Sequence, residues 1–212
     1  LTEIGDYAFS QCSGLTYIRL PDSLTNIGRN AFMDCSSITS VNIPAKVTNI
    51  GREAFWNCSS LESVTITKGV TNIESYAFWG CSSLKKVDIP ESVTKIKSNA
   101  FSNCKNLESV TIQNPKCELE SILSKSTVTI YGYEGSTAQA YAEEHNIKFQ
   151  SLGEAPIHGD VDGEISLTDL LLLRLYLRNP KSKNLPKTCD MNADGKINVI
   201  DLALLKRELL KR

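Results

Sequence analysis

The sequence predicts an α/β solenoid built from short parallel strands, followed by a small all-α domain with two calcium-loop-helix (F-hand) motifs. Three observations predict this fold class: a 23-residue repeat, alternating apolar residues within each repeat, and two oxygen-rich loops near the C-terminus that each lead into a leucine-faced helix. The length of 212 residues suits one or two domains. The net charge of -1 is spread without blocks, which argues against nucleic acid and anionic membrane surfaces as partners.

The repeat consists of aligned columns of identical residues. The phenylalanine column is Phe9, Phe32, Phe55, Phe78 and Phe101, and the cysteine column is Cys12, Cys35, Cys58, Cys81 and Cys104. A fixed period in this range with recurrent apolar columns is typical of a leucine-rich repeat solenoid. Leu61, Val64 and Ile66 belong to a segment that alternates toward its end, which predicts one short strand per repeat. Because one repeat cannot bury its apolar side alone, neighbouring repeats must stack.

The frame "AFWNCSSLESVTITKGVTNI" recurs with small changes, and in this the chain resembles the BspA-like leucine-rich repeat family over residues 1–113. The resemblance specifies a fold and says little about function. Leu1 shares a column with Leu24, so we expect the chain to be a piece of a longer protein. A signal peptide would then not be visible.

Residues 114–152 predict a C-terminal cap, which a solenoid needs to close its apolar end. The segment "STAQAYAEEHN" predicts a helix with Ser136 or Thr137 as N-cap. Its expected inward side chains are Ala138, Ala140, Tyr141 and Ala142. The segments "TVTIYGY" and "IKFQSL" predict two strands, and residues 153–157, "GEAPI", predict a linker.

The column cysteines are predicted to be small, buried, reduced residues whose S–H groups donate to loop carbonyls. Neighbouring thiols in a ladder could instead be oxidised, although disulfide geometry is demanding. Cys117 and Cys189 lie outside the column, and the sequence suggests no role for either. His145 and His158 fall in the cap and near the linker, so neither pairs with a nucleophile. We therefore predict no catalytic residues and no enzyme activity in this chain.

Strand positions between the apolar ones should face outward on the concave side. They are Tyr17, Arg19, Ser40, Asn42, Ser63, Thr65, Lys86, Asp88, Ser109 and Thr111. This hydroxyl-rich set suits a polar partner and suits plain solvent equally. Trp56 and Trp79 follow the phenylalanine column in adjacent repeats and should stack. Such a pair could bind a sugar ring or a partner protein by stacking. Alternatively, it only covers the edge of the repeats.

The segment "DMNADGKINVID", residues 190–201, predicts a calcium loop. Oxygen-bearing side chains stand at alternating positions, with Gly195 placed for the sharp turn. The predicted ligands are Asp190, Asn192, Asp194, Asn198, Asp201 and the backbone carbonyl of Lys196. Asp201 stands where the common pattern has glutamate. The alternative is an Asx-rich turn that only caps the helix from Val199.

A shortened copy of this loop, "DVDGEISLTD", occupies residues 160–169. Two residues are missing relative to the second loop, so one ligand position has no counterpart. The ligands that remain are Asp160, Asp162, Asp169, the carbonyl of Glu164, and Ser166 directly or through water. Losing a side-chain oxygen should weaken or reshape the site. The sequence leaves two alternatives for this first loop: it binds Ca²⁺, or hydrogen bonds alone hold it in shape.

Two such loop-helix units joined by "RNPKSKNLPK" resemble a type I dockerin over residues 158–212. The resemblance implies two calcium sites, binding to a cohesin module of a scaffoldin, and an extracellular or cell-surface place on a cellulosome. It also implies partner contacts at Leu167, Thr168, Arg174, Leu175, Val199, Ile200, Lys206 and Arg207. Because the two halves differ at these positions, a single binding orientation is favoured. Alternatively, Leu167, Val199 and Ile200 close the small core between the helices.

Three function classes follow from these patterns. We favour a non-catalytic cellulosomal component whose repeats form a protein or glycan recognition module. The second class is a cell-surface adhesin anchored through its dockerin. The third is a piece of an enzyme whose catalytic module lies outside this sequence.

Overall fold

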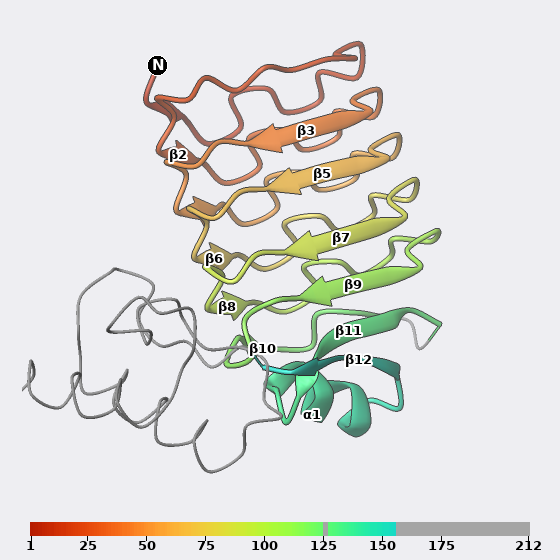
Figure 1. Ribbon diagram of the computed structural model, residues 1–212. Coiled ribbons are helices and arrows are strands. Elements are labelled where there is room, and N and C mark those ends of the chain that lie inside the picture. Colours follow the sequence, from red (N-terminus) through yellow and green to blue (C-terminus); the bar gives the residue numbers. More distant parts are fainter. Residues whose placement is uncertain (125–126, 156–212) are drawn as a thin grey trace, which may run out of the picture. The chain divides into compact units, whose positions relative to one another are not determined.

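The computed structural model describes residues 1–124 and 127–155 (Figure 1). A boundary after Ala155 divides the chain into two units, Leu1–Ala155 and Pro156–Arg212. The first unit is described below by itself. The predicted all-α domain lies outside the described residues.

Each turn of the solenoid contributes a long strand, a short strand or both, and all pairings are parallel. The long strands are β3 (Ser40–Ile43), β5 (Ser63–Ile66), β7 (Lys86–Ile89) and β9 (Ser109–Ile112). The short strands are β1 (Glu3–Ile4), β2 (Asn26–Ile27), β4 (Asn49–Ile50), β6 (Asn72–Ile73), β8 (Lys95–Ile96) and β10 (Glu118–Leu119). The short strands form one six-stranded sheet, so the solenoid has about six turns.

The register of both ladders follows the 23-residue period. Val41 lies opposite Val64 in the long strands, and Ile50 lies opposite Ile73 in the short ones. The parallel-strand solenoid predicted from the repeat is therefore confirmed. The predicted strand is confirmed in the four repeats that contain β3, β5, β7 and β9. The second, shorter strand, which the "VTNI" segment and its counterparts supply, was not predicted from the sequence.

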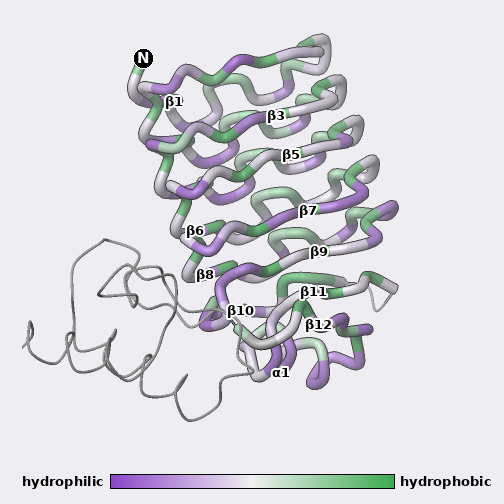
Figure 2. Tube along the Cα trace, viewed as in Figure 1, coloured by the Kyte–Doolittle hydropathy of each residue, from purple (hydrophilic) through white to green (hydrophobic). Residues whose placement is uncertain are grey.

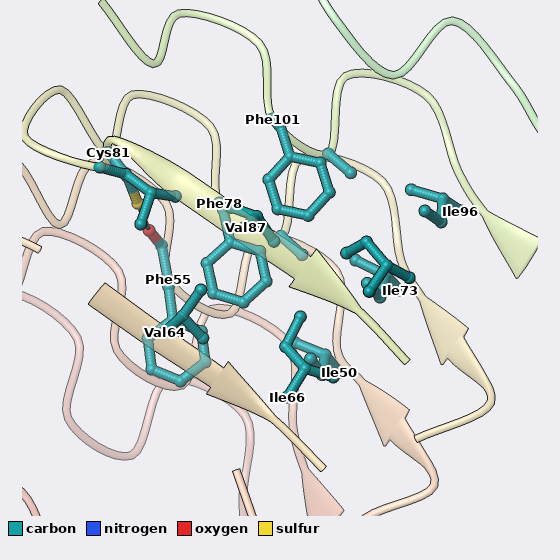
Figure 3. Close-up of a cluster of buried hydrophobic side chains, with 14 of the residues drawn as sticks. Ile50, Phe55, Val64, Ile66, Ile73, Phe78, Cys81, Val87, Ile96 and Phe101 are labelled. Atoms are coloured by element: carbon teal, nitrogen blue, oxygen red, sulfur yellow. Dashed lines mark hydrogen bonds between the residues drawn. The ribbon is translucent and has the colours of Figure 1, made fainter. Parts of the chain in front are cut away.

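The core is a set of side-chain ladders that run through the stacked turns (Figure 3). Rings in the phenylalanine column stack with centroids 5.1 to 5.4 Å apart. In the long strands the burial pattern alternates, so Val64 and Ile66 point inward while their neighbours face out. The tube coloured by hydropathy shows the same alternation along the strands (Figure 2). Burying one phenylalanine or isoleucine side chain contributes roughly 1.5–3 kcal/mol, so these columns supply the main stabilisation.

Two positions in each of the first five turns have positive φ, which lets the chain reverse on the phenylalanine side. The first column is Tyr7, Asn30, Glu53, Tyr76 and Asn99, and the second is Gln11, Asp34, Asn57, Gly80 and Asn103. Asparagine and aspartate adopt this region more readily than most residues, which accounts for their frequency here. Successive turns are joined at these reversals by backbone bonds such as that from Asn57 N–H to the carbonyl of Trp79, 2.7 Å.

The first turn departs from the pattern. Residues 17–20 stand where later turns have a long strand, yet they form no strand, and β3 pairs only with β5. No backbone hydrogen bond joins residues 16–20 to 39–43, whereas Glu62 N–H donates to the Thr39 carbonyl in the next turn, 2.9 Å. The strand expected in this first repeat is therefore absent.

The C-terminal end is closed by α1 (Thr137–Glu144), which lies against β11 (Thr129–Glu134) and β12 (Lys148–Glu154) (Figure 1). Both strands and the helix confirm the predicted elements of the cap. Ser136 is the N-cap, and its Oγ accepts from Gln139 N–H at 3.3 Å. β12 extends two residues into the segment predicted as a linker.

Three of the four side chains predicted to face inward from α1 are buried: Ala138, Tyr141 and Ala142. Ala140 is exposed, so its prediction was wrong. Residues at i, i+3 and i+4 share a helix face, whereas i+2 points to the opposite side. The Tyr141 hydroxyl accepts from the backbone N–H of Ile122, 3.1 Å, which ties the helix to the last turn.

Candidate functional surfaces

The predicted calcium ligands, from Asp160 to Asp201, all lie outside the described residues, and so do the predicted cohesin contacts, from Leu167 to Arg207. Their predictions rest on the sequence and on the family comparison below. Within residues 1–124 and 127–155, no group of three or more His, Cys, Asp or Glu side chains could hold a metal ion.

The cysteine ladder donates to backbone carbonyls as predicted. The Sγ atoms of Cys35, Cys58, Cys81 and Cys104 lie 3.0 to 3.3 Å from the carbonyl oxygen of a phenylalanine in the preceding turn. Figure 3 shows Cys81 next to Phe55. All six cysteines in the described part of the chain are free. Each of these carbonyls also accepts a backbone N–H, as that of Phe55 does from Cys58, so the buried S–H is a second donor to the same oxygen.

Burial also makes these thiols poor nucleophiles. It raises the pKa of Cys35 to about 11 and that of Cys117 to about 12, and it raises the pKa of Cys58 and Cys81 well above the usual range. Thiolate is the reactive form, so a raised pKa suppresses both attack and oxidation. The ladder therefore has a structural role.

Cys117, for which the sequence suggested no role, belongs to a sixth turn. Its backbone N–H donates to the carbonyl three residues before it, as Val93 does one turn earlier, and its side chain is fully buried. It thus fills the valine column. The following strand β10 pairs with β8, so the segment predicted as pure cap begins with one more turn of the solenoid.

His145 contributes to the cap. Its ring stacks on Tyr141 with centroids 4.1 Å apart, and its Nδ1 lies 2.9 Å from the Tyr141 carbonyl oxygen at the end of α1. His145 therefore packs against the C-terminal end of α1, with one ring nitrogen next to a backbone carbonyl of that helix end.

The long strands present the predicted outward positions. The side chains of Ser40, Asn42, Ser63, Thr65, Lys86 and Asp88 are exposed, and those of Ser109 and Thr111 are half-buried. Within the described residues, these side chains make no hydrogen bond or ion pair with one another or with other groups. The side of the short strands differs, because there Thr71 Oγ1 donates to the Thr48 carbonyl at 3.0 Å and Lys97 Nζ contacts Glu74 Oε2 at 2.8 Å. Polar groups of the long-strand face are therefore available to a partner.

The tryptophan pair stacks as predicted. The rings of Trp56 and Trp79 lie 4.9 Å apart at an interplanar angle of 6°, and both side chains are half-buried. Neither indole N–H has a hydrogen-bond partner among the described residues. Nearby, the Arg52 guanidinium lies 6.0 Å from the centre of the Tyr76 ring. This edge combines aromatic surface with free donors.

Comparison with known proteins identifies both parts of the chain. Six copies of the BspA type leucine rich repeat region match residues 2–131. The chain belongs to this family of BspA-type leucine-rich repeat proteins. The dockerin type I domain matches residues 158–210, so the repeats precede a dockerin. Comparison with curated proteins gave no match.

Two solved structures show how this BspA-type chain relates to others. A leucine-rich repeat protein from T. pallidum is 26% identical with a TM-score of 0.54, and the match covers 71% of this chain and 79% of that one. A leucine-rich cell surface protein from Faecalibacterium prausnitzii is 42% identical with a TM-score of 0.50 over 52% of this chain, but only 29% of that one. Among the described residues, no helix has the length and hydrophobicity to span a membrane.

Proposed function

We propose that this protein is a non-catalytic component of an extracellular, cellulosome-type complex. Its dockerin binds a cohesin module, and its BspA-type repeats form a recognition module for a protein or glycan. The observation that carries this proposal is the match of residues 158–210 to the type I dockerin family, in the same region where the sequence predicts two calcium loops. Burial raises the pKa of Cys35 and Cys117, so these thiols are poor nucleophiles, which agrees with the non-catalytic role proposed.

Type I dockerin domains generally bind calcium, and the donors in this chain fit that ion. The second loop offers five oxygen-bearing side chains and the carbonyl of Lys196. These supply six oxygens, or seven if one aspartate binds through both atoms, and Ca²⁺ takes six to eight. Asp201 would connect the loop to the helix that follows, so the ion would hold the helix in place. Metal binding of this kind is coupled to folding.

The first loop is proposed to bind calcium more weakly. It lacks one ligand position, and affinity follows the number and charge of the ligands. At low calcium concentration the second loop would fill first. The dockerin would then be half-ordered, with Val199 and Ile200 presented before Leu167 and Thr168.

Calorimetric titration of the full chain with a panel of cohesin modules tests this proposal, first with Ca²⁺ and then with EDTA. We expect one-to-one binding to at least one cohesin and its loss in EDTA. Asp201→Ala should abolish binding, and Asp169→Ala should weaken it. Asp88→Ala on the repeats is the matched control, because it removes an exposed carboxylate far from either loop in sequence and should change nothing.

A second titration separates partner contact from core packing at Val199. If Val199 contacts the cohesin, Val199→Asp removes binding while calcium still stabilises the protein against thermal unfolding. If Val199 closes the small core, the calcium-dependent stabilisation falls too. Binding that persists unchanged in EDTA would contradict the dockerin proposal.

The second candidate function is a cell-surface adhesin, which the 42% identity to a leucine-rich cell surface protein favours. In that case the dockerin is an anchor and the repeats carry the main activity. Calcium binding by the chain without affinity for any cohesin, together with adherence of the repeats to cells or matrix, would support the adhesin.

A further inference from the structure

The outer face of the long strands is hollowed at its N-terminal end. A cleft of about 270 Å³ lies between the first turn and β3, lined by two aliphatic side chains and by Tyr17, Arg19, Asp22, Ser40 and Asn42. It lies beside the first turn, in which the expected long strand is absent. Residues 17–20 make no backbone bond to β3, whereas β3 pairs with β5 on its other side.

The polar side chains of this cleft have no partner within the described residues. Tyr17, Arg19 and Asp22 make no hydrogen bond, ion pair or ring contact, although a guanidinium and a carboxylate line the same cleft. In contrast, Lys95 on the short-strand side contacts Glu118 at 3.1 Å. The cleft therefore keeps its donors and acceptors free, whereas the short-strand side pairs many of its own.

The side chains around the cleft are complementary to a sugar ring. Tyr17 is 68% exposed and offers a flat apolar ring, against which the C–H face of a pyranose can pack. Arg19 offers a fork of N–H donors, Asp22 offers acceptors, and Asn42 offers both. Sugar hydroxyls both donate and accept, so neighbouring hydroxyls can pair with this mixed set. The charges of Arg19 and Asp22 cancel, which favours a neutral ligand over an anionic one.

We propose that this cleft binds one neutral pyranose unit of a glycan, with the ring on Tyr17 and its hydroxyls on Arg19, Asp22 and Asn42. The inference deepens the recognition role proposed for the repeats and rests on it. The volume is slightly below the roughly 300 Å³ at which pockets for drug-sized ligands begin, which suits a single sugar unit. The exposed hydroxyls of Ser63 and Thr65 continue along β5, so a longer glycan can extend over the face.

The test is calorimetric titration of the full chain with short neutral oligosaccharides of glucose, xylose, mannose and galactose, and with oligogalacturonate as an anionic comparison. We expect one or more neutral sugars to bind at millimolar concentration or below. Tyr17→Ala and Asp22→Ala should each weaken binding about tenfold or more, because each removes one of the principal contacts. Tyr17→Phe keeps the ring and should retain most of the affinity.

Tyr7→Asn is the matched control. It removes an exposed tyrosine of the same turn that does not line the cleft, and asparagine tolerates the positive φ at this position. The proposal is overturned if no neutral oligosaccharide binds, if Tyr17→Ala binds as well as the unaltered chain, or if only the anionic sugar binds. Competition for the cleft by a peptide, with no sugar binding, would assign it to a protein partner instead. Cohesin titration of the same variants tests the dockerin separately, so failure of one proposal does not mask the other.

Discussion

Truncating the phenylalanine ladder at two positions tests whether stacking between turns supplies the stability of the solenoid. Phe78 is fully buried and stacks on both neighbours, with centroids 5.3 and 5.4 Å away. Phe78→Ala therefore removes a whole ring from a close-packed core, and we expect a loss of about 3–5 kcal/mol in the free energy of unfolding. Phe9 is the same residue type in the same column, but it is 38% exposed and stacks on one side only. Phe9→Ala should cost about 1–2 kcal/mol.

Urea unfolding of the full chain, followed by tryptophan fluorescence, measures both values. The two tryptophans of the chain, Trp56 and Trp79, both lie in the repeats, so the signal reports this unit alone. Phe9 lies in the end turn and stacks on one side only, so Phe9→Ala should shift the transition by less than Phe78→Ala does. Equal losses for the two variants, or a loss below about 1 kcal/mol for Phe78→Ala, would refute the ladder as the principal stabilising element.

Two further predictions concern the packing of turns and the buried thiols. Gly69→Ala would place a Cβ 1.7 Å from the Ala45 carbonyl oxygen, so we expect a loss of about 1–3 kcal/mol in urea unfolding. Gly14→Ala, with nothing within 4 Å of its Cβ, is the control and should cost under about 1 kcal/mol. Burial raises the pKa of Cys35 from 9.0 to about 11, so the unfolded chain ionises first and stability falls as pH rises from about 9 to 11. The fall should be about 1.4 kcal/mol per pH unit for this thiol. The other buried thiols contribute to the same limb, so Cys35→Ala should make it less steep by about this amount, and an unchanged slope would contradict the assignment.

Sequence periodicity was sufficient to predict the solenoid, its phenylalanine and cysteine columns, and the elements of its cap. These features repeat at a fixed interval or carry strong local signals, as Ser136 does before α1. The short strands were missed because two residues are too few to show an alternation. The sixth turn was missed because it lacks the phenylalanine and cysteine of the other turns. One signal could have found it: Leu119 follows Ile96 by 23 residues and pairs with it.

The cleft could not be predicted for a different reason. Tyr17 and Arg19 fit the alternating pattern, so the sequence placed them on a strand like their counterparts in later turns. Residues 17–20 nevertheless form no strand beside β3, and no residue type in this segment marks the difference. Side-chain columns thus predict which way the groups face, whereas the cleft depends on the path of the first turn beside β3, which the columns do not specify.

The two sides of the solenoid show how a repeat fold can combine stability with recognition. On the short-strand side, polar side chains join successive turns, as Ser98 Oγ does when it donates to Glu120 Oε2 at 2.6 Å. Replacing such a residue changes the contact between turns. On the long-strand side, the backbone ladder and the inward residues already hold the turns together, so an outward residue such as Thr65 can change at little cost. Binding specificity is therefore expected to reside on the long-strand face, where the cleft lies.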